Sequence, residues 1–208
     1  MKRIAIVIAG TFVFSLAATA TDYGQMDTFL GYTFTRFNSS STLPSYNANG
    51  GSAQWAYNFN KWFSGVVDAG AVTSCCIGGD RTFSLVDVNR TVVNILAGPR
   101  VSLRVGRLKR LKPYAQVLFG GAYANASAPA VGVLPLPNSF PRDITTSWGF
   151  AMTAGGGLDI KVSKHVYVRP VQAEYFLNQL QSFQGFGKET WNNFRYSAGI
   201  NFTYGRPQ

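Results

Sequence analysis

The apolar stretch nearest the end of the chain, FRYSAGINFTY at Phe194–Tyr204, alternates strictly between two kinds of side chain. Every second residue from Phe194 onward is aromatic or apolar, and the residues between them are polar or small. A period of two indicates a β-strand with one apolar and one polar face. A soluble sheet buries the apolar face in a core, whereas a membrane barrel turns it to lipid and keeps the polar face inside.

The alternation recurs in seven further segments, which predicts about eight strands in all. Several are longer than the five or six residues typical of soluble sheets, and they approach the roughly nine to eleven residues of a tilted strand that crosses a bilayer. The pattern is lost near Arg36 and around Pro170, where a β-bulge would explain the change. The segments are Met26–Asn38, Ser52–Asn60, Trp62–Val72, Thr91–Val105, Lys112–Ala124, Ser147–Val162 and His165–Gln179.

Composition indicates which face looks inward. Only 13% of the residues are charged, about half the usual share of a soluble domain. The polar faces carry charged residues such as Arg100 and Asp159, which could not fill a dry core, and the aromatic faces would make a poor surface in water. Both difficulties disappear in lipid. The sequence therefore predicts an all-β fold, an eight-stranded antiparallel up-and-down transmembrane β-barrel.

The first residues have the features of a secretory signal peptide. Lys2 and Arg3 precede an apolar run at Ile4–Leu16, and Ala18–Ala20 fits the small-x-small cleavage pattern. A membrane anchor is the alternative, but the run is too short to span a bilayer comfortably and no charged stop follows it. We therefore expect a signal peptide at residues 1–20, export from the cytoplasm, and a barrel domain at 21–208.

The connections between the expected strands alternate in length. Three are short, and four are long and rich in turn residues. This alternation is typical of outer-membrane barrels, in which long loops face outside the cell and both termini lie on the side of the short turns. The short connections are Asn60–Lys61, Gly106–Pro113 and Ser163–His165, and the long ones are Ser39–Gly51, Ser74–Asn89, Asn125–Thr146 and Leu180–Trp191.

Five blocks, in order and spacing, resemble the small outer-membrane β-barrel (porin-like) proteins related to the transmembrane domain of outer-membrane protein A. The resemblance covers nearly all of the chain after residue 20. It implies an integral outer-membrane protein with a structural or narrow-pore role, without a cofactor. The blocks are Gly31–Asn38, Leu96–Leu103, Lys112–Ala122, Phe150–Tyr175 and Asn192–Gly205.

The same resemblance gives the last strand a second meaning. Barrels of this class end on a pattern of one polar residue, one glycine and two aromatic or apolar residues, matched here by Ser197, Gly199, Phe202 and Tyr204. It implies that the outer-membrane assembly machinery recognises this strand as an added edge strand. The tail at Gly205–Gln208 departs from the pattern, because many members stop at the aromatic residue.

Charged residues on the polar faces are the candidates for function. An interior enclosed by eight strands is just wide enough for side chains to fill. The charges therefore form salt bridges that plug a narrow lumen, or they line a gated polar path for ions or small solutes. The candidates are Asp68, Arg100, Arg104, Asp159, Lys161, Glu174 and Arg195.

Other activities find little support in the sequence. The formal charge is +10, yet the basic residues form no continuous patch and no nucleic-acid motif is present. Cys75 and Cys76 are adjacent, and an exported chain can pair them with each other or with another chain. Gly155–Gly157 lies within a strand, where it favours close packing over phosphate binding. With His165 as the only histidine, we expect neither a metal site nor enzymatic activity.

Three functional hypotheses follow. The first is a passive outer-membrane barrel with a structural or narrow-pore role, held in lipid by its apolar outer face. The second is the same barrel acting through its long loops as an adhesin or receptor, with the apolar loop at 126–146 as the surface for a partner. The third is a secreted lipocalin-like carrier of apolar ligands, which the small and charged residues opposite the aromatic faces disfavour.

Overall fold

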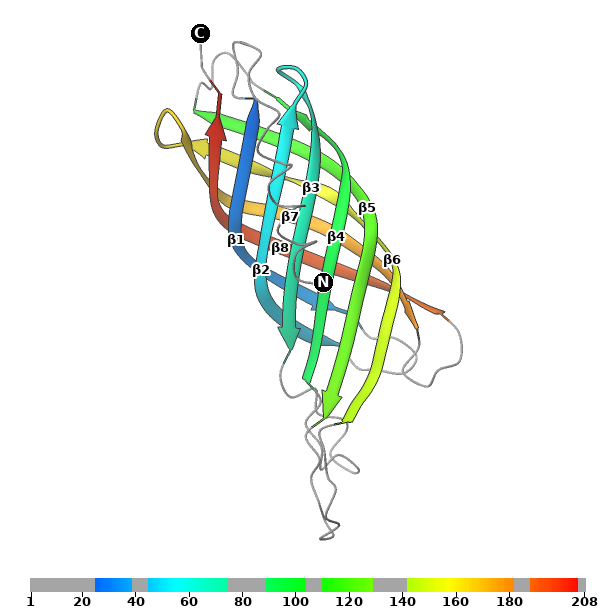
Figure 1. Cartoon of the computed structure of the whole chain (residues 1–208). Coiled ribbons are helices and arrows are strands. Elements are labelled where there is room, and N and C mark those ends of the chain that lie inside the picture. Colours follow the sequence, from blue (N-terminus) through cyan, green and yellow to red (C-terminus); the bar gives the residue numbers. More distant parts are fainter. Residues whose placement is uncertain are drawn as a thin grey trace, which may run out of the picture.

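The chain forms strands and short turns over the residues that the computed structural model describes, which are 25–38, 45–74, 89–103, 110–128, 142–181 and 188–205. Each strand is antiparallel to the next, and β1 also pairs with β8, so the sheet closes into a barrel (Figure 1). The predicted eight-stranded up-and-down barrel is confirmed. The strands are β1 (Met26–Phe37), β2 (Tyr46–Asn58), β3 (Phe63–Ser74), β4 (Asn89–Ser102), β5 (Leu111–Ala128), β6 (Arg142–Lys161), β7 (Val166–Gln181) and β8 (Lys188–Tyr204).

The two faces of each strand differ as the alternation predicts. In β4, Ile95 is 62% exposed while the adjacent Leu96 is fully buried. In β8, Phe194 and Ile200 are exposed on the outer wall, and Arg195 between them is buried. The polar face of β8 therefore points into the barrel. An apolar outer wall is the opposite of what a soluble lipocalin-like carrier needs. Among the described residues, no helix is long and apolar enough to cross a membrane.

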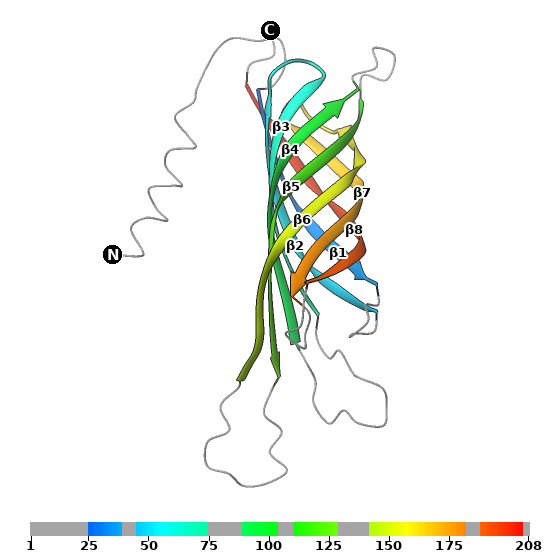
Figure 2. The same cartoon turned by 90° about the vertical axis from the view of Figure 1, so that its right-hand side faces the viewer.

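Several strands extend into segments that the sequence predicts as loops. β2 begins at Tyr46, β8 begins at Lys188, and β5 pairs with β6 as far as Ala128 and Arg142. The backbone ladder continues in these segments although their residues show no apolar alternation, so the hydrophobic pattern cannot detect it. Figure 2 shows the β5–β6 hairpin extending past the other strands, on the side away from the C terminus.

The short turns lie at one end of the barrel, which we call the short-turn end, and the opposite end is the loop end. In the β2–β3 turn, the Asn60 side-chain oxygen accepts hydrogen bonds from the backbone N–H groups of Trp62 (2.8 Å) and Phe63 (2.7 Å). Met26 pairs with Tyr204, so β1 begins and β8 ends at this same end. This placement agrees with the predicted position of the termini.

One of the two predicted bulges is present. The pairing of β7 with β8 shifts between Arg169 and Gln172, on either side of Pro170. Proline cannot donate a ladder hydrogen bond, which explains the irregularity at this point. In β1, by contrast, the register with β2 runs unbroken from Met26 to Phe37, so the bulge predicted near Arg36 is wrong. The alternation there looks irregular because aromatic residues occupy both faces of β1.

Candidate functional site

Charged side chains from the inward strand faces meet inside the barrel. Five of the seven predicted lumen residues, Asp68, Arg100, Asp159, Glu174 and Arg195, are at most 2% exposed. Each occupies an inward position because alternate residues of a strand share one face. Buried charges need partners, since transferring an unpaired charge out of water is very costly. The pairing of these groups therefore decides what the interior can do.

The other two predicted lumen residues do not join this group. Lys161 is the last residue of β6, and its side chain is exposed at the short-turn end. By the alternation of β6, Lys161 is on the same face as Asp159. However, the pairing with β7 shifts between Leu158 and Ile160, and β6 ends at Lys161, at the rim of the barrel. Placing Lys161 in the lumen is therefore wrong. Arg104 lies outside the described residues.

Arg195 holds two carboxylates from different sides of the lumen. Its guanidinium lies 2.7 Å from a carboxylate oxygen of Asp68 on β3 and 2.6 Å from one of Glu174 on β7. Glu174 is the register partner of Arg195, whereas β3 and β8 are not neighbours in the barrel. The pair with Asp68 therefore crosses the lumen. Asn94 on β4 donates a further hydrogen bond to Asp68 at 3.1 Å.

Arg169 forms a second group, which the sequence did not reveal. It binds Asp159 through two nitrogens, at 2.7 and 3.1 Å, in the bidentate geometry that arginine and carboxylate favour. Its remaining terminal nitrogen donates to the side-chain oxygens of Gln54 (2.8 Å) and Gln172 (2.7 Å). Asn201 donates to the same Asp159 carboxylate at 3.0 Å. The group thus joins β2, β6, β7 and β8.

Arg100 connects these two groups. It donates to the side-chain oxygens of Gln54 and Gln116, and Gln116 in turn donates to Glu174 at 2.7 Å. Gln54 accepts from both Arg100 and Arg169 through one oxygen. An unbroken hydrogen-bonded chain results, which we call the interior polar chain. It runs through Asn201, Asp159, Arg169, Gln54, Arg100, Gln116, Glu174, Arg195, Asp68 and Asn94.

Aromatic rings pack against the two connecting guanidinium groups. Arg100 lies 4.4 Å and Arg169 lies 4.5 Å from the ring centroid of Tyr114, and Arg169 also lies 4.2 Å from that of Phe29. These distances allow favourable cation–π contact. Gly157 leaves room for this arrangement, because a Cβ there would crowd the Tyr114 hydroxyl and the backbone oxygen of Val171. The close packing predicted for the Gly155–Gly157 segment is present here.

A further ion pair crosses the lumen at the short-turn end. Lys112 on β5 lies 2.7 Å from Asp27 on β1, and both side chains are nearly buried. Asp27 also accepts hydrogen bonds from Thr203 (2.7 Å) and Asn58 (3.3 Å). Because β1 and β5 lie on opposite sides of the eight-stranded barrel, this pair links facing walls. Neither residue was among the predicted lumen candidates.

Aromatic side chains fill the interior at the loop end. We call Phe37, Tyr46, Phe176 and Trp191 the aromatic group. Phe37 stacks on Tyr46 with ring centroids 4.7 Å apart, and it meets Phe176 and Trp191 edge to face at 6.5 Å. Arg90 lies over the Trp191 ring, 4.7 Å from its centroid. Since all four rings are buried, this half of the interior is closed by apolar packing.

The residues of the predicted assembly signal lie along the seam between β8 and β1. The Ser197 hydroxyl is buried and lies 2.9 Å from that of Thr33 on β1. Gly199 pairs with Gly31, and a Cβ at Gly199 would overlap the backbone of Leu30 and Gly31. Phe202 is partly exposed and Tyr204 is exposed, both near the short-turn end. Recognition by the assembly machinery stays a prediction.

Other predicted features lie away from the interior. His165 is exposed in the β6–β7 turn, with its Nδ1 atom 3.3 Å from the backbone oxygen of Thr203. Cys75 and Cys76 lie outside the described residues. Within the described ranges, no three histidine, cysteine or acidic residues are grouped so that they could hold a metal ion.

No protein-family model matches the sequence, and no curated protein sequence matches it. Solved structures do match. Ail, the attachment invasion locus protein of Yersinia pestis, gives a TM-score of 0.58 at 16% identity, covering 88% of this chain and 99% of its own. Neisserial surface protein A gives a TM-score of 0.54 at 16% identity, covering 86% of this chain and 97% of its own. Outer membrane protein OprG from Pseudomonas aeruginosa gives a TM-score of 0.52 at 12% identity, covering 90% of this chain and 99% of its own. The chain thus has the fold of small outer-membrane barrels, as its resemblance to that family implies.

Proposed function

We propose that this protein, which has the fold of the small eight-stranded outer-membrane barrels, is an integral outer-membrane protein with a passive, structural role and a closed interior. The observation that carries the proposal is the interior polar chain, which crosses the lumen with every link at hydrogen-bond distance. At the loop end, the aromatic group adds a second closure. An ion that passed through the barrel would have to disrupt both.

The outer wall supports insertion in lipid. The apolar side chains of Leu30, Ile95 and Phe150 are each about half exposed or more. A soluble protein rarely presents a continuous apolar band of this kind to water. Aromatic side chains gather at the short-turn end, where Phe59, Trp62 and others are exposed, and Trp and Tyr favour membrane interfaces. A lipid environment removes the cost of exposing all these side chains to water.

Export and assembly complete the proposal. We propose that residues 1–20 are a signal peptide and that residues 21–208 form the barrel domain, with the short-turn end in the periplasm. The pattern of Ser197, Gly199, Phe202 and Tyr204 supports recognition of β8 by the outer-membrane assembly machinery. Gly199 also has a steric role in the seam, so a signal function must be separated from a packing function.

The β5–β6 hairpin favours a second candidate function at the cell surface. β6 pairs with β7 only from Ala151 onward, so its first residues, from Arg142, pair with β5 alone. Trp148 lies on this projecting part and is 71% exposed. Ail has also been solved in complex with the heparin analogue sucrose octasulfate. We propose a surface ligand or partner for the loop end as the alternative to a purely structural role.

Conductance of the refolded protein in a planar bilayer tests the closed interior. Heat-modifiable migration on a gel first shows that the barrel is folded. We expect silent traces from the unaltered protein and from the single variants Gln54→Ala and Trp191→Ala, because two barriers lie in series. The double variant is expected to show only rare, brief openings, because the Asp68–Arg195 and Asp27–Lys112 pairs still cross the lumen. Frequent, discrete openings of the unaltered protein would contradict the closed interior and support the narrow-pore alternative.

A further inference from the structure

A basic depression lies at the short-turn end of the barrel. Arg110, Lys161 and Lys164 line it together with Val162 and Ser163, and its volume is about 550 Å³. The backbone N–H of Lys161 donates to the carbonyl oxygen of Arg110 at 2.7 Å, which brings the residues before β5 against the β6–β7 turn. Three cations, one just before β5 and two from the end of β6 and the turn that follows it, therefore converge on one place.

Among the side chains that the structure describes, none supplies a counter-charge to these cations. Four acidic residues have described side chains, and these residues, Asp27, Asp68, Asp159 and Glu174, are all buried and take part in the interior ion pairs. Asp159, which is closest to the depression in sequence, is bound to Arg169. Like charges that share a site repel one another, so an external anion would stabilise the arrangement.

The position of the depression identifies the kind of anion. Val162 is 67% exposed within the lining, and it continues the outward, apolar face of β6. Cations therefore lie directly beside the lipid-facing wall, at the end of the barrel that also carries Trp62 and Tyr204. Long lysine side chains can keep their charges at the interface while their methylene groups cover apolar surface. This is the arrangement that a headgroup phosphate above an acyl chain requires.

We propose that this basic depression binds the headgroup of an anionic phospholipid in the periplasmic leaflet. The inference rests on the membrane insertion and orientation proposed above. The phosphate lies among Arg110, Lys161 and Lys164, the Ser163 hydroxyl donates to a headgroup oxygen, and an acyl chain lies along Val162. Negative charge at a membrane surface attracts basic residues, and each cation raises the affinity for the membrane about fivefold.

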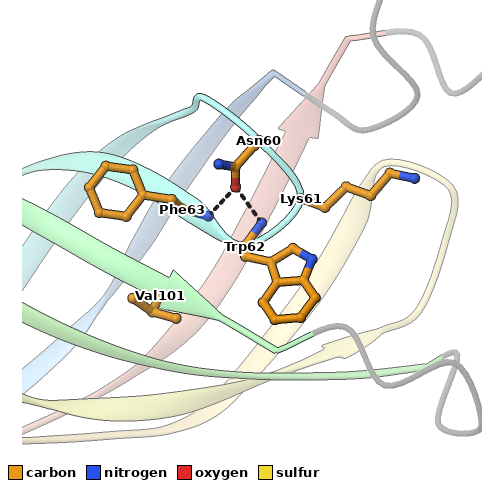
Figure 3. A pocket seen from close by; sticks show the side chains of 5 residues that line it. All are labelled: Asn60, Lys61, Trp62, Phe63 and Val101. Atoms are coloured by element: carbon orange, nitrogen blue, oxygen red, sulfur yellow. Dashed lines mark hydrogen bonds between the residues drawn. The ribbon is translucent and has the colours of Figure 1, made fainter.

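A second depression at the same end provides a matched control. It is lined by Asn60, Lys61, Trp62, Phe63 and Val101, and its volume is about 660 Å³. Figure 3 shows its single cation, Lys61, pointing away from the Trp62 ring. Aromatic and apolar residues with one cation suit the interface of any phospholipid. Only the basic depression should therefore select for a negatively charged headgroup.

The test compares lipid retention by the mature protein in nanodiscs of phosphatidylcholine with a minor fraction of phosphatidylglycerol. Native mass spectrometry of the released protein reports which lipid stays bound. We expect the unaltered protein to retain phosphatidylglycerol in preference to phosphatidylcholine, and the variant R110Q/K161Q/K164Q to lose this preference. The control Lys61→Gln and the charge-retaining variant K161R/K164R are expected to keep it.

Three outcomes would overturn the inference. Equal retention of both lipids by the unaltered protein excludes an anion-selective site. If Lys61→Gln loses the preference for phosphatidylglycerol as fully as the triple variant does, the preference is a general effect of charge. Inorganic phosphate and sodium chloride are compared at the same ionic strength. If phosphate displaces more of the bound lipid than sodium chloride does, the site binds a dissolved anion. Failure to enter nanodiscs at all would refute the membrane proposal itself, whereas entry without lipid preference refutes only this inference.

Discussion

The two halves of the barrel interior are closed by different physical means. Toward the short-turn end, the interior polar chain joins arginines, carboxylates and amides in directed hydrogen bonds. Toward the loop end, the aromatic group closes the interior by ring packing, and Arg90 lies over Trp191. The comparison shows that one narrow lumen accepts both solutions, with charged groups held by hydrogen bonds in one half and rings packed together in the other.

The largest expected effect is in the polar half. Arg195→Ala leaves Asp68 and Glu174 buried without their shared cation. Breaking a buried ion pair by removing one partner typically costs about 3–5 kcal/mol. We expect a loss of that size in the free energy of unfolding, measured by urea titration in micelles. Arg36→Ala, at an exposed arginine that binds Asn47 and Ser45, is the control. A similar loss in both variants would contradict the role given to Arg195.

In the aromatic half, the expected loss of stability lies toward the lower end of the same range. Trp191→Ala removes a buried ring that contacts Phe37 and Tyr46, and large-to-alanine changes of this kind cost about 3 kcal/mol or more. Trp191→Phe, which retains a ring, is expected to recover most of the loss. The same urea titration measures both variants. If the alanine variant unfolds like the unaltered protein, the rings are not a structural closure.

The smallest expected effect lies at the seam. Ser197→Ala removes one buried hydroxyl that contacts Thr33, and a neutral hydrogen bond contributes about 1 kcal/mol. Ser197→Thr keeps the hydroxyl and is the matched control. The free energy of unfolding measures the contribution of Ser197 to packing. The yield of folded barrel in cells measures its contribution to the proposed assembly signal. A large loss of yield with a small loss of stability would support recognition by the assembly machinery.

Much of the polar half could be predicted from the sequence, because charged residues stand out on alternating strands. Asp68, Glu174 and Arg195 lie on inward faces in both the sequence pattern and the structure. Arg169 was missed because Arg169 and Gln172 have opposite parity, yet both are buried. The register shift between them turns both side chains inward, and a simple period of two cannot describe that.

The aromatic half could not be predicted by the same reasoning. The sequence pattern predicts that the aromatic faces of the alternating strands turn to lipid, which holds for Phe194 and Phe150 on the outer wall. Phe37 faces inward instead, and so does Trp191, which the sequence places in the Leu180–Trp191 loop. Few of the described side chains at the loop end of the lumen are charged, so apolar rings fill it at little cost. Ring type alone therefore does not distinguish the two faces. A better signal is the polarity of the residues two positions away, which lie on the same face. For Phe37 this residue is the polar Thr35.

The seam between β1 and β8 has a consequence for how the protein acquires its structure. Thr33 and Ser197, which meet there, are 164 residues apart in the chain. Contacts between residues so distant in sequence form slowly, because a long loop must close before they contribute. Until β8 arrives, Asp68 and Glu174 also lack Arg195. Nascent chains without β8 therefore have neither a closed wall nor the cation that Asp68 and Glu174 share, so closure of the barrel must await β8.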